Sequence, residues 1–130
     1  MADEHCAVDT NIAVMLMNGV PSVVSMFSKY SNVLCPAPVI SELYFSAHKS
    51  TRTTENIDRI ERLLLRCVPL DIDSQAAVHY ANVRWELKQS GQMIPMNAIW
   101  IAAVCLRHDL PLVTFDTHFE RIGRLKLVRP

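Results

Sequence analysis

The chain has 130 residues with thirteen basic and thirteen acidic side chains, so its formal net charge at pH 7 is zero. Half of the residues are hydrophobic and only three are glycine, a composition that excludes a disordered chain. We expect one compact domain over residues 1–130, and the balanced charge excludes a protein that binds nucleic acid through a uniformly basic surface.

The first half of the chain predicts short strands that alternate with helices. An apolar strand stops at the polar Asp9, and Pro21 suits the first turn of a helix. Apolar residues then recur at helical spacing between Thr54 and Arg66. The expected elements are a strand at 6–8, an apolar segment at 12–17 that Asn18 and Gly19 break, a helix from Pro21 to about Tyr30, a strand at 33–35, a helix from Pro38 to about His48, and a helix at 54–66.

The second half continues the same alternation. Asp73 is a favourable N-cap, and Gly91 suits the left-handed residue that closes a helix. The expected elements are an extended segment at 68–70, a long helix between Asp73 and Gly91, a helix that Pro95 and Asn97 start and that covers 99–107, a strand at 112–115, a turn around Phe119 and Ile122, and a final segment at 125–128.

Short apolar strands that alternate with amphipathic helices predict an α/β fold, with three layers (α/β/α) around a central, mostly parallel sheet. In such sheets the functional groups gather at the carboxyl ends of the strands. Asp9 and Asp116 both follow predicted strands directly, so we expect them at this edge.

Three acidic residues interrupt apolar sequence, whereas most other acids fall on polar helix faces. These three are Asp9, Glu42 and Asp116. A buried carboxylate costs several kcal/mol unless it is paired, protonated or bound to a metal, so three of them in one place would need a cation. Hard oxygen ligands suit Mg²⁺ or Mn²⁺, and such an ion can activate water for phosphodiester hydrolysis.

Each acid also has a simpler interpretation. A strand-end aspartate such as Asp9 or Asp116 is often a turn former or an N-cap. Glu42 could favour the positive end of its helix. Taken singly, these residues do not distinguish a structural role from a functional one.

Four motifs carry a resemblance to a known family. They are Asp9–Asn11, Ser41–Leu43, Ile94–Asn97 followed by Trp100–Ala103, and Val113–Asp116 with Phe119–Glu120. In order, spacing and total length the chain resembles the PIN-domain VapC toxins. The resemblance implies a single PIN domain that acts as a Mg²⁺- or Mn²⁺-dependent endoribonuclease, with RNA, above all tRNA, as substrate. It also implies a cognate VapB-like antitoxin as partner, a homodimer and a cytoplasmic location.

Residue by residue, the resemblance implies that Asp9, Glu42 and Asp116 are three of four acidic catalytic and metal-binding residues. Thr10, Asn11 and Thr114 would hold the carboxylates or a metal-bound water. For the two threonines, local capping of the backbone is an equal alternative. For Asn97 we expect a helix cap rather than a metal ligand.

Ala98 departs from the family pattern, which usually has aspartate at this position. Alanine cannot bind a metal, but it is the best helix former, so the fold should tolerate it. An introduced inactivating substitution and a natural loss both account for Ala98, and the intact neighbouring motifs favour the first. The nuclease activity of this chain is therefore expected to be impaired, and the alternative function is a catalytically silent protein that binds RNA or an antitoxin.

Other features carry weaker predictions. The basic residues either line a phosphate-binding rim or belong to solvated helix faces: Arg84, Lys88, Arg107, Arg121, Arg124 and Lys126. We expect Trp85 and Trp100 in the core or an interface rather than stacked on bases. A phosphatase or a DNA-acting nuclease would use the same acids.

The cysteines and the apolar segments bear on the compartment. The four cysteines are far apart in apolar surroundings, so we expect free, buried thiols in a reduced protein: Cys6, Cys35, Cys67 and Cys105. The polar, acidic start at residues 1–5 predicts no signal peptide. The longest apolar run, Ala98–Leu106, is about half of the roughly 20 residues needed to cross a bilayer, which predicts no membrane segment.

Overall fold

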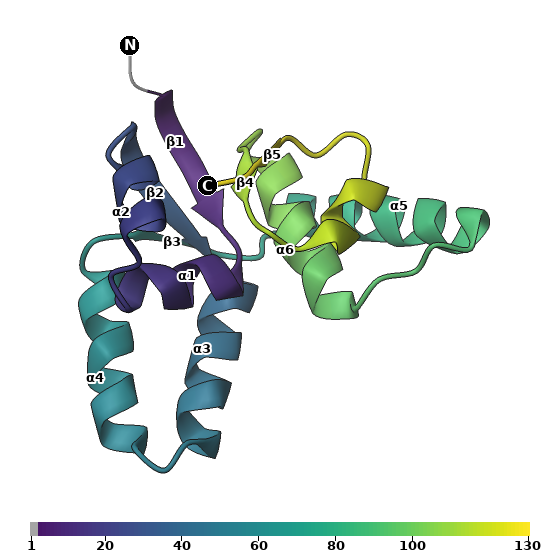
Figure 1. Ribbon diagram of the computed structural model, residues 1–130. Helices are drawn as coiled ribbons and strands as arrows, with labels where there is room; N and C mark the ends of the chain where they lie inside the picture. The colour runs from purple at the N-terminus through teal and green to yellow at the C-terminus, as the bar shows by residue number, and fades with distance from the viewer. Residues whose placement is uncertain (1–2) are drawn as a thin grey trace.

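The computed structural model describes residues 3–130 and contains a five-stranded parallel sheet with the strand order β3-β2-β1-β4-β5. The sheet lies at the centre of the molecule, with helices around it (Figure 1). The elements in chain order are β1 (Asp3–Val8), α1 (Thr10–Met17), α2 (Pro21–Phe27), β2 (Tyr30–Pro36), α3 (Ala37–Lys49), α4 (Thr53–Leu64), β3 (Val68–Leu70), α5 (Ser74–Ser90), α6 (Met96–Arg107), β4 (Leu112–Val113), the 3₁₀ helix η1 (Thr117–Arg121) and β5 (Leu127–Val128).

The connections place helices on both sides of the sheet. Because crossovers between parallel strands are right-handed, the connections from β1 to β2 and from β2 to β3 carry their helices over one face. The connection from β3 to β4 runs in the opposite direction along the sheet and carries α5 and α6 over the other face. The predicted α/β/α arrangement is confirmed, and every strand pair in residues 3–130 is parallel.

Several predicted boundaries differ from the structure, among them the start of β1, which lies at Asp3 rather than at residue 6. Helix α2 ends at Phe27 rather than near Tyr30, because Tyr30 already pairs with the first residue of β1. For the same reason β2 covers residues 30–36 rather than 33–35. Strand β4 ends at Val113 because its partner β5 ends opposite, at Val128, so the expected continuation to Phe115 is wrong.

Helix α6 is the central helix of the core. Its residues 98–99 and 101–105 are all buried, together with large side chains from other elements such as Phe119, Ile12 and Leu63. The long helix α5 packs against α6 through Tyr80, whose ring stacks on Trp100 with 3.8 Å between the ring centroids. This packing holds the start of α6 in a fixed position beside the sheet edge.

The side chains of the two tryptophans lie in different environments. Trp100 is half-buried against Tyr80, as expected. Trp85, on α5, is 60% exposed, so of the two predicted locations the core is wrong and an interface stays a prediction. The periodicity of α5 is too weak to assign its faces, since exposed apolar residues such as Val78 lie on it as well.

All four cysteines are free and buried, as predicted. Burial raises the pKa of the Cys35 thiol to about 12, which keeps it neutral and unreactive. Among residues 3–130 no single helix has both the length and the apolar composition to cross a membrane. Helices α1 and α2 meet that requirement only as a pair, and the chain bends by 104° between them.

The ends of α5 follow the sequence prediction. Asp73 caps its start by accepting a hydrogen bond from the backbone N–H of Ala76 at 2.8 Å. Gly91 closes it in the left-handed conformation, with φ at +67°. A residue with a Cβ atom is strained by about 1–2 kcal/mol in this conformation.

Replacing Gly91 with alanine should therefore lower the free energy of unfolding by about 1 kcal/mol, as measured by urea denaturation. No heavy atom lies within 4 Å of the position that the new Cβ would take, so the backbone conformation alone causes the loss. Gly123→Ala is the matched control, because Gly123 is equally open but lacks a left-handed φ. Equal effects of the two substitutions would contradict this explanation.

Candidate active site

A small acidic pocket lies at the carboxyl ends of β1 and β4. These strands are hydrogen-bonded neighbours, with Val8 opposite Val113, so the residues that follow each strand come together. The pocket has a volume of about 170 Å³. It is lined by Asp9, Thr10, Asn11, Glu42, Pro95, Asn97, Ala98, Ile101, Asp116 and Phe119.

Asp9 is the most buried acid of the pocket, with 7% of its surface exposed. It is the N-cap of α1, and its Oδ1 accepts a hydrogen bond from the backbone N–H of Thr10 at 2.7 Å. Its Oδ2 accepts a hydrogen bond from the Thr114 hydroxyl at 2.8 Å. The N-cap interpretation is thus confirmed, but capping uses only one oxygen of a carboxylate that also lines the pocket.

The surroundings of Asp9 disfavour its negative charge. Burial raises the pKa of Asp9 above its ordinary value of 3.8, and the hydrogen bonds from Thr114 and Thr10 lower it in part. The negative charges of Asp116 and Glu42 raise it further. A carboxylate that is desolvated and repelled by two others would be stabilised by a bound cation.

Thr114 fixes two acids at once. Its hydroxyl donates to Asp9, and the same oxygen accepts the backbone N–H of Asp116 at 2.9 Å. Thr114 is 2% exposed, so no solvent competes with these bonds. Both interpretations of Thr114 hold, since it caps the backbone locally and also orients a carboxylate on another strand.

Glu42 lies in the second turn of α3, beyond the first turn where a helix dipole favours acids. The interpretation of Glu42 as a helix-end residue is therefore wrong. Its Oε2 accepts a hydrogen bond from the Thr10 hydroxyl, and its Oε1 accepts one from the Asn97 side-chain amide. These bonds hold the Glu42 carboxylate at the pocket wall and link α3 to α1 and α6.

Asn97 does not cap its helix. Pro95 occupies the N-cap position of α6 and provides no side-chain cap. Asn97 lies one residue inside the helix and donates to Glu42 and, at 3.4 Å, to the carbonyl oxygen of Pro38. The predicted capping role is wrong because an acceptor from another helix is available to its amide.

Asp116 is the N-cap of η1, and its Oδ1 accepts the backbone N–H of His118 at 2.9 Å. The Nδ1 atom of His118 lies 3.0 Å from the same oxygen, a contact that sequence reasoning missed although His118 follows Asp116 by two positions.

Asn11 lines the pocket and is exposed, but it forms no hydrogen bond to the carboxylates within the described chain. Of the expected residues, Asn11 is thus the one without a direct contact to an acid.

Ala98 lines the pocket from the third residue of α6 and is 8% exposed. In residues 3–130 no three side chains of His, Cys, Asp or Glu lie close enough to bind a metal ion together. The pocket therefore offers separated carboxylates, and water would have to complete the coordination of a divalent cation. Mg²⁺, which retains several waters when bound, fits such a donor set better than a metal that needs a closed protein cage.

Comparison with known proteins places this geometry in context. The sequence profile of the PIN domain matches residues 6–125. The chain is 34% identical to a protein named Ribonuclease VapC2 from Haemophilus influenzae, over 91% of this chain and 92% of that relative. It is 33% identical, with the same coverage of both chains, to the tRNA(fMet)-specific endonuclease VapC of Shigella flexneri.

Solved structures agree with the sequence relatives. The fold matches a chain of DNA-bound VapBC from Salmonella typhimurium with a TM-score of 0.89, at 26% identity, over 98% of both chains. It matches a chain of VapBC2 from Rickettsia felis with a TM-score of 0.88, at 25% identity, over 96% of this chain and 98% of that chain. With a profile match over most of its length and similar relatives along nearly all of it, the chain belongs to the PIN-domain family.

Proposed function

We propose that this protein is a metal-dependent endoribonuclease of the VapC type that hydrolyses RNA phosphodiester bonds. The observation that carries the proposal is the acidic pocket, in which Asp9, Glu42 and Asp116 from three parts of the chain converge. The identity to the VapC ribonuclease of Haemophilus influenzae supports RNA as the substrate. Two relatives named tRNA(fMet)-specific endonucleases support tRNA as the substrate class, and therefore action in the cytoplasm.

Asp9, Asp116 and Glu42 would hold Mg²⁺ or Mn²⁺ in part through bridging water, because no three such side chains in residues 3–130 lie close enough to bind one ion directly. The bound ion would supply an activated water and stabilise the leaving oxygen of the cleaved phosphodiester. The chain's own residues orient the carboxylates: Thr114 aims Asp9, while Thr10 and Asn97 aim Glu42. Asn11, exposed at the pocket rim, contacts water or the RNA backbone in this proposal.

Ala98 limits the activity in this proposal. A side chain at this position points into the same pocket from the first turn of α6, where an N-terminal dipole favours a carboxylate. An aspartate there would add a fourth acid to the three that are present. With alanine, the cation is held more weakly and turnover falls.

A protein partner belongs to the proposal as well. The VapBC complexes among the solved neighbours support a VapB-like antitoxin as a partner of this chain. In this proposal, on the family resemblance, the antitoxin covers the acidic pocket. We also propose that the protein forms a homodimer, because the family resemblance implies one. Ala98 also favours a second candidate, a catalytically silent protein that retains RNA or antitoxin binding.

Ala98→Asp should raise metal-dependent cleavage of total tRNA by at least about tenfold, because it restores a missing carboxylate. The assay incubates the parent and the variant with tRNA, DNA and a phosphomonoester, in Mg²⁺, Mn²⁺ or EDTA. Ala98→Asn is the matched control, since it adds similar volume without a charge. Absence of RNA cleavage and of Mn²⁺ binding by calorimetry in both chains would exclude the nuclease, and cleavage confined to DNA or the phosphomonoester would reassign the substrate.

Asp9→Asn should stabilise the metal-free protein at neutral pH. A raised pKa means that the protonated Asp9 favours the folded state, a contribution that is complete below the unfolded pKa of about 3.8 and is lost as pH rises through the folded pKa. An asparagine at position 9 does not lose stability as the pH rises, because it carries no charge. It can still accept a hydrogen bond from the Thr10 backbone N–H and donate one to the Thr114 hydroxyl oxygen.

Urea unfolding in EDTA at a series of pH values measures this effect. The difference in free energy of unfolding between Asp9→Asn and the parent should grow from about pH 4 upward and then level off. Millimolar Mg²⁺ should reduce the difference, because it stabilises the ionised carboxylate of the parent. The control is Asp71→Asn, at an exposed position, and a pH-independent difference at position 9 would refute the electrostatic explanation.

A further inference from the structure

A groove separate from the acidic pocket has no role in the chemistry described above. It lies on one face of α5 and has a volume of about 560 Å³. Its lining residues are Tyr80, Ala81, Arg84, Trp85, Lys88 and Met93. Positions 81, 84, 85 and 88 share a helix face because residues three and four apart are neighbours on a helix.

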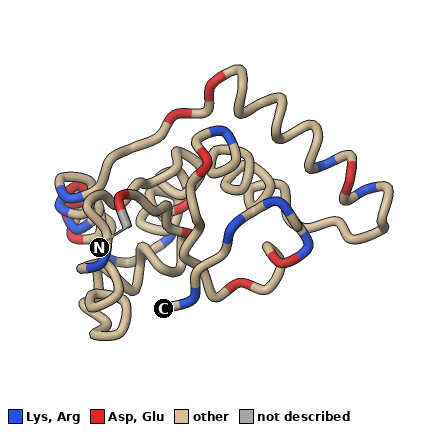
Figure 2. Tube along the Cα trace, turned by 90° about the horizontal axis from the view of Figure 1, so that it is seen from above, with Lys and Arg blue, Asp and Glu red and all other residues tan. Residues whose placement is uncertain are grey.

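The groove presents an exposed aromatic ring on the same helix face as two cations. Trp85 is 60% exposed, an unusual state for the largest apolar side chain. Arg84 and Lys88 form no ion pair within residues 3–130, although the Arg84 guanidinium lies 6.0 Å from the Tyr80 ring centre. Figure 2 shows basic and acidic positions alternating near the end of α5, where the sequence has Arg84, Glu86 and Lys88. Glu86 is paired with Arg124 at 3.1 Å, so its charge does not neutralise the groove.

Most other basic residues of the second half of the chain are already paired. The pairs are Arg107 with Asp73, Arg124 with Glu86, Lys126 with Asp109, and Arg129 with Glu120. Arg121 is also occupied, since it donates to backbone carbonyl oxygens. Of the basic rim considered from the sequence, Arg84 and Lys88 therefore keep their charge available to a ligand.

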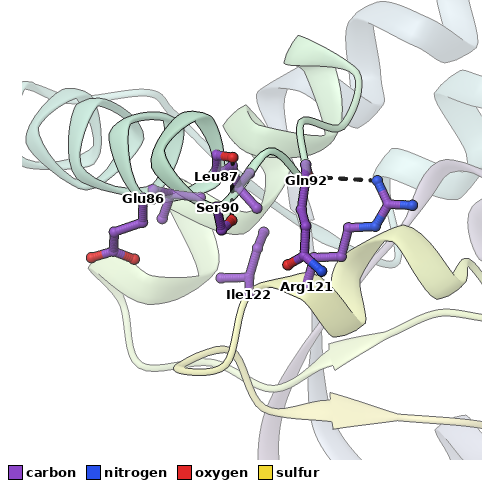
Figure 3. Close-up of a pocket in the computed structure, with 7 residues that line it drawn as sticks. Glu86, Leu87, Ser90, Gln92, Arg121 and Ile122 are labelled. Atoms are coloured by element: carbon purple, nitrogen blue, oxygen red, sulfur yellow. Dashed lines mark hydrogen bonds between the residues drawn. The ribbon is translucent and has the colours of Figure 1, made fainter.

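The groove and the acidic pocket are connected by one short, fixed segment. Met93 lines the groove and Pro95 lines the pocket. Arg121 holds this segment by donating to the carbonyl oxygens of Gln92 at 3.5 Å and Met93 at 3.1 Å, and Figure 3 shows its guanidinium turned toward Gln92. Below the groove, Tyr80 stacks on Trp100, two residues beyond Ala98 on α6. A ligand in the groove would thus be held at a fixed position relative to the pocket.

We propose that this groove, which residues 93–95 connect to the acidic pocket, is a subsite for single-stranded RNA in which the Trp85 indole stacks on a base while Arg84 and Lys88 contact flanking phosphates. The inference rests on the proposed ribonuclease function and adds to it the means of holding the substrate. Charge complementarity favours RNA as the occupant, because the groove carries cations without counter-charges. A protein of zero net charge with an acidic pocket needs such a local anchor, since its overall field does not attract RNA. Proteins that bind single-stranded nucleic acid usually combine cations that contact the phosphates with aromatic rings that stack on the bases.

The test measures the affinity of fluorescein-labelled oligouridylate for the full chain by fluorescence anisotropy. Trp85→Ala should weaken binding by about tenfold, and Trp85→Phe should restore part of the loss. Arg84→Ala with Lys88→Ala should weaken binding and reduce the dependence of log affinity on log salt by about 0.7 for each phosphate contact removed. In a Trp100→Phe background, the fluorescence of Trp85 should be quenched on addition of oligouridylate.

Phe45→Ala and Lys49→Ala are the matched controls. Phe45 is 62% exposed on α3 and has the Lys49 ammonium 4.8 Å from its ring, so it is a second aromatic–cation pair outside the groove. These substitutions should leave the affinity unchanged. An affinity that is unaffected by the groove substitutions, or equally affected by the controls, overturns the proposal.

Other occupants would give different results. If Trp85→Ala changes the mass in analytical ultracentrifugation or abolishes antitoxin binding while RNA affinity stays the same, the groove is a protein interface and the RNA assignment is wrong. In the Ala98→Asp background, Trp85→Ala should raise KM for RNA with little change in kcat. If the Ala98→Asp chain does not cleave RNA at all, the nuclease function is refuted. If it cleaves RNA but Trp85→Ala leaves KM unchanged, only the groove proposal is refuted.

Discussion

The hydrogen bond from the Thr114 hydroxyl to Asp9 determines the arrangement of the candidate site. It joins the end of β4 to the end of β1, and the same hydroxyl oxygen receives the backbone N–H of Asp116. Since Asp9 is buried, this bond replaces part of the hydration that its carboxylate loses. It does not cancel the repulsion from Glu42 and Asp116. The uncompensated part of the charge is the physical reason for proposing a divalent cation in this pocket.

The parts of the site that follow directly from a strand could be predicted from the sequence. An apolar run that ends in a carboxylate places Asp9 and Asp116 at the carboxyl edge of a parallel sheet, and the pairing of β1 with β4 brings them together. Glu42 could be joined to them only through the family resemblance, because no local pattern tells which helix faces the pocket. The role of Asn97 was mispredicted for the same reason. Its partner Glu42 is 55 residues away, and a contact of this kind is set by tertiary packing.

The overall composition conceals a separation of charge. The formal net charge is zero, yet acids gather in the pocket, while Arg84 and Lys88 on one face of α5 form no ion pair within residues 3–130. Trp85 lines the same groove as these cations, and sequence periodicity alone did not place it at the surface. A net charge therefore says little about ligand binding when most ions of one sign are paired and a few are not.

At position 98 the residue that favours the stability of the fold differs from the residue that would favour catalysis. This difference affects which variants a selection for stability would retain. Ala98 suits a helix and adds no charge to a pocket that already contains repelling carboxylates. An aspartate there would serve the proposed reaction at the expense of the folded state whenever no cation is bound. A screen for thermostable or well-expressed variants would consequently enrich alanine at this site, and so would favour the form that lacks the fourth carboxylate, whatever its activity.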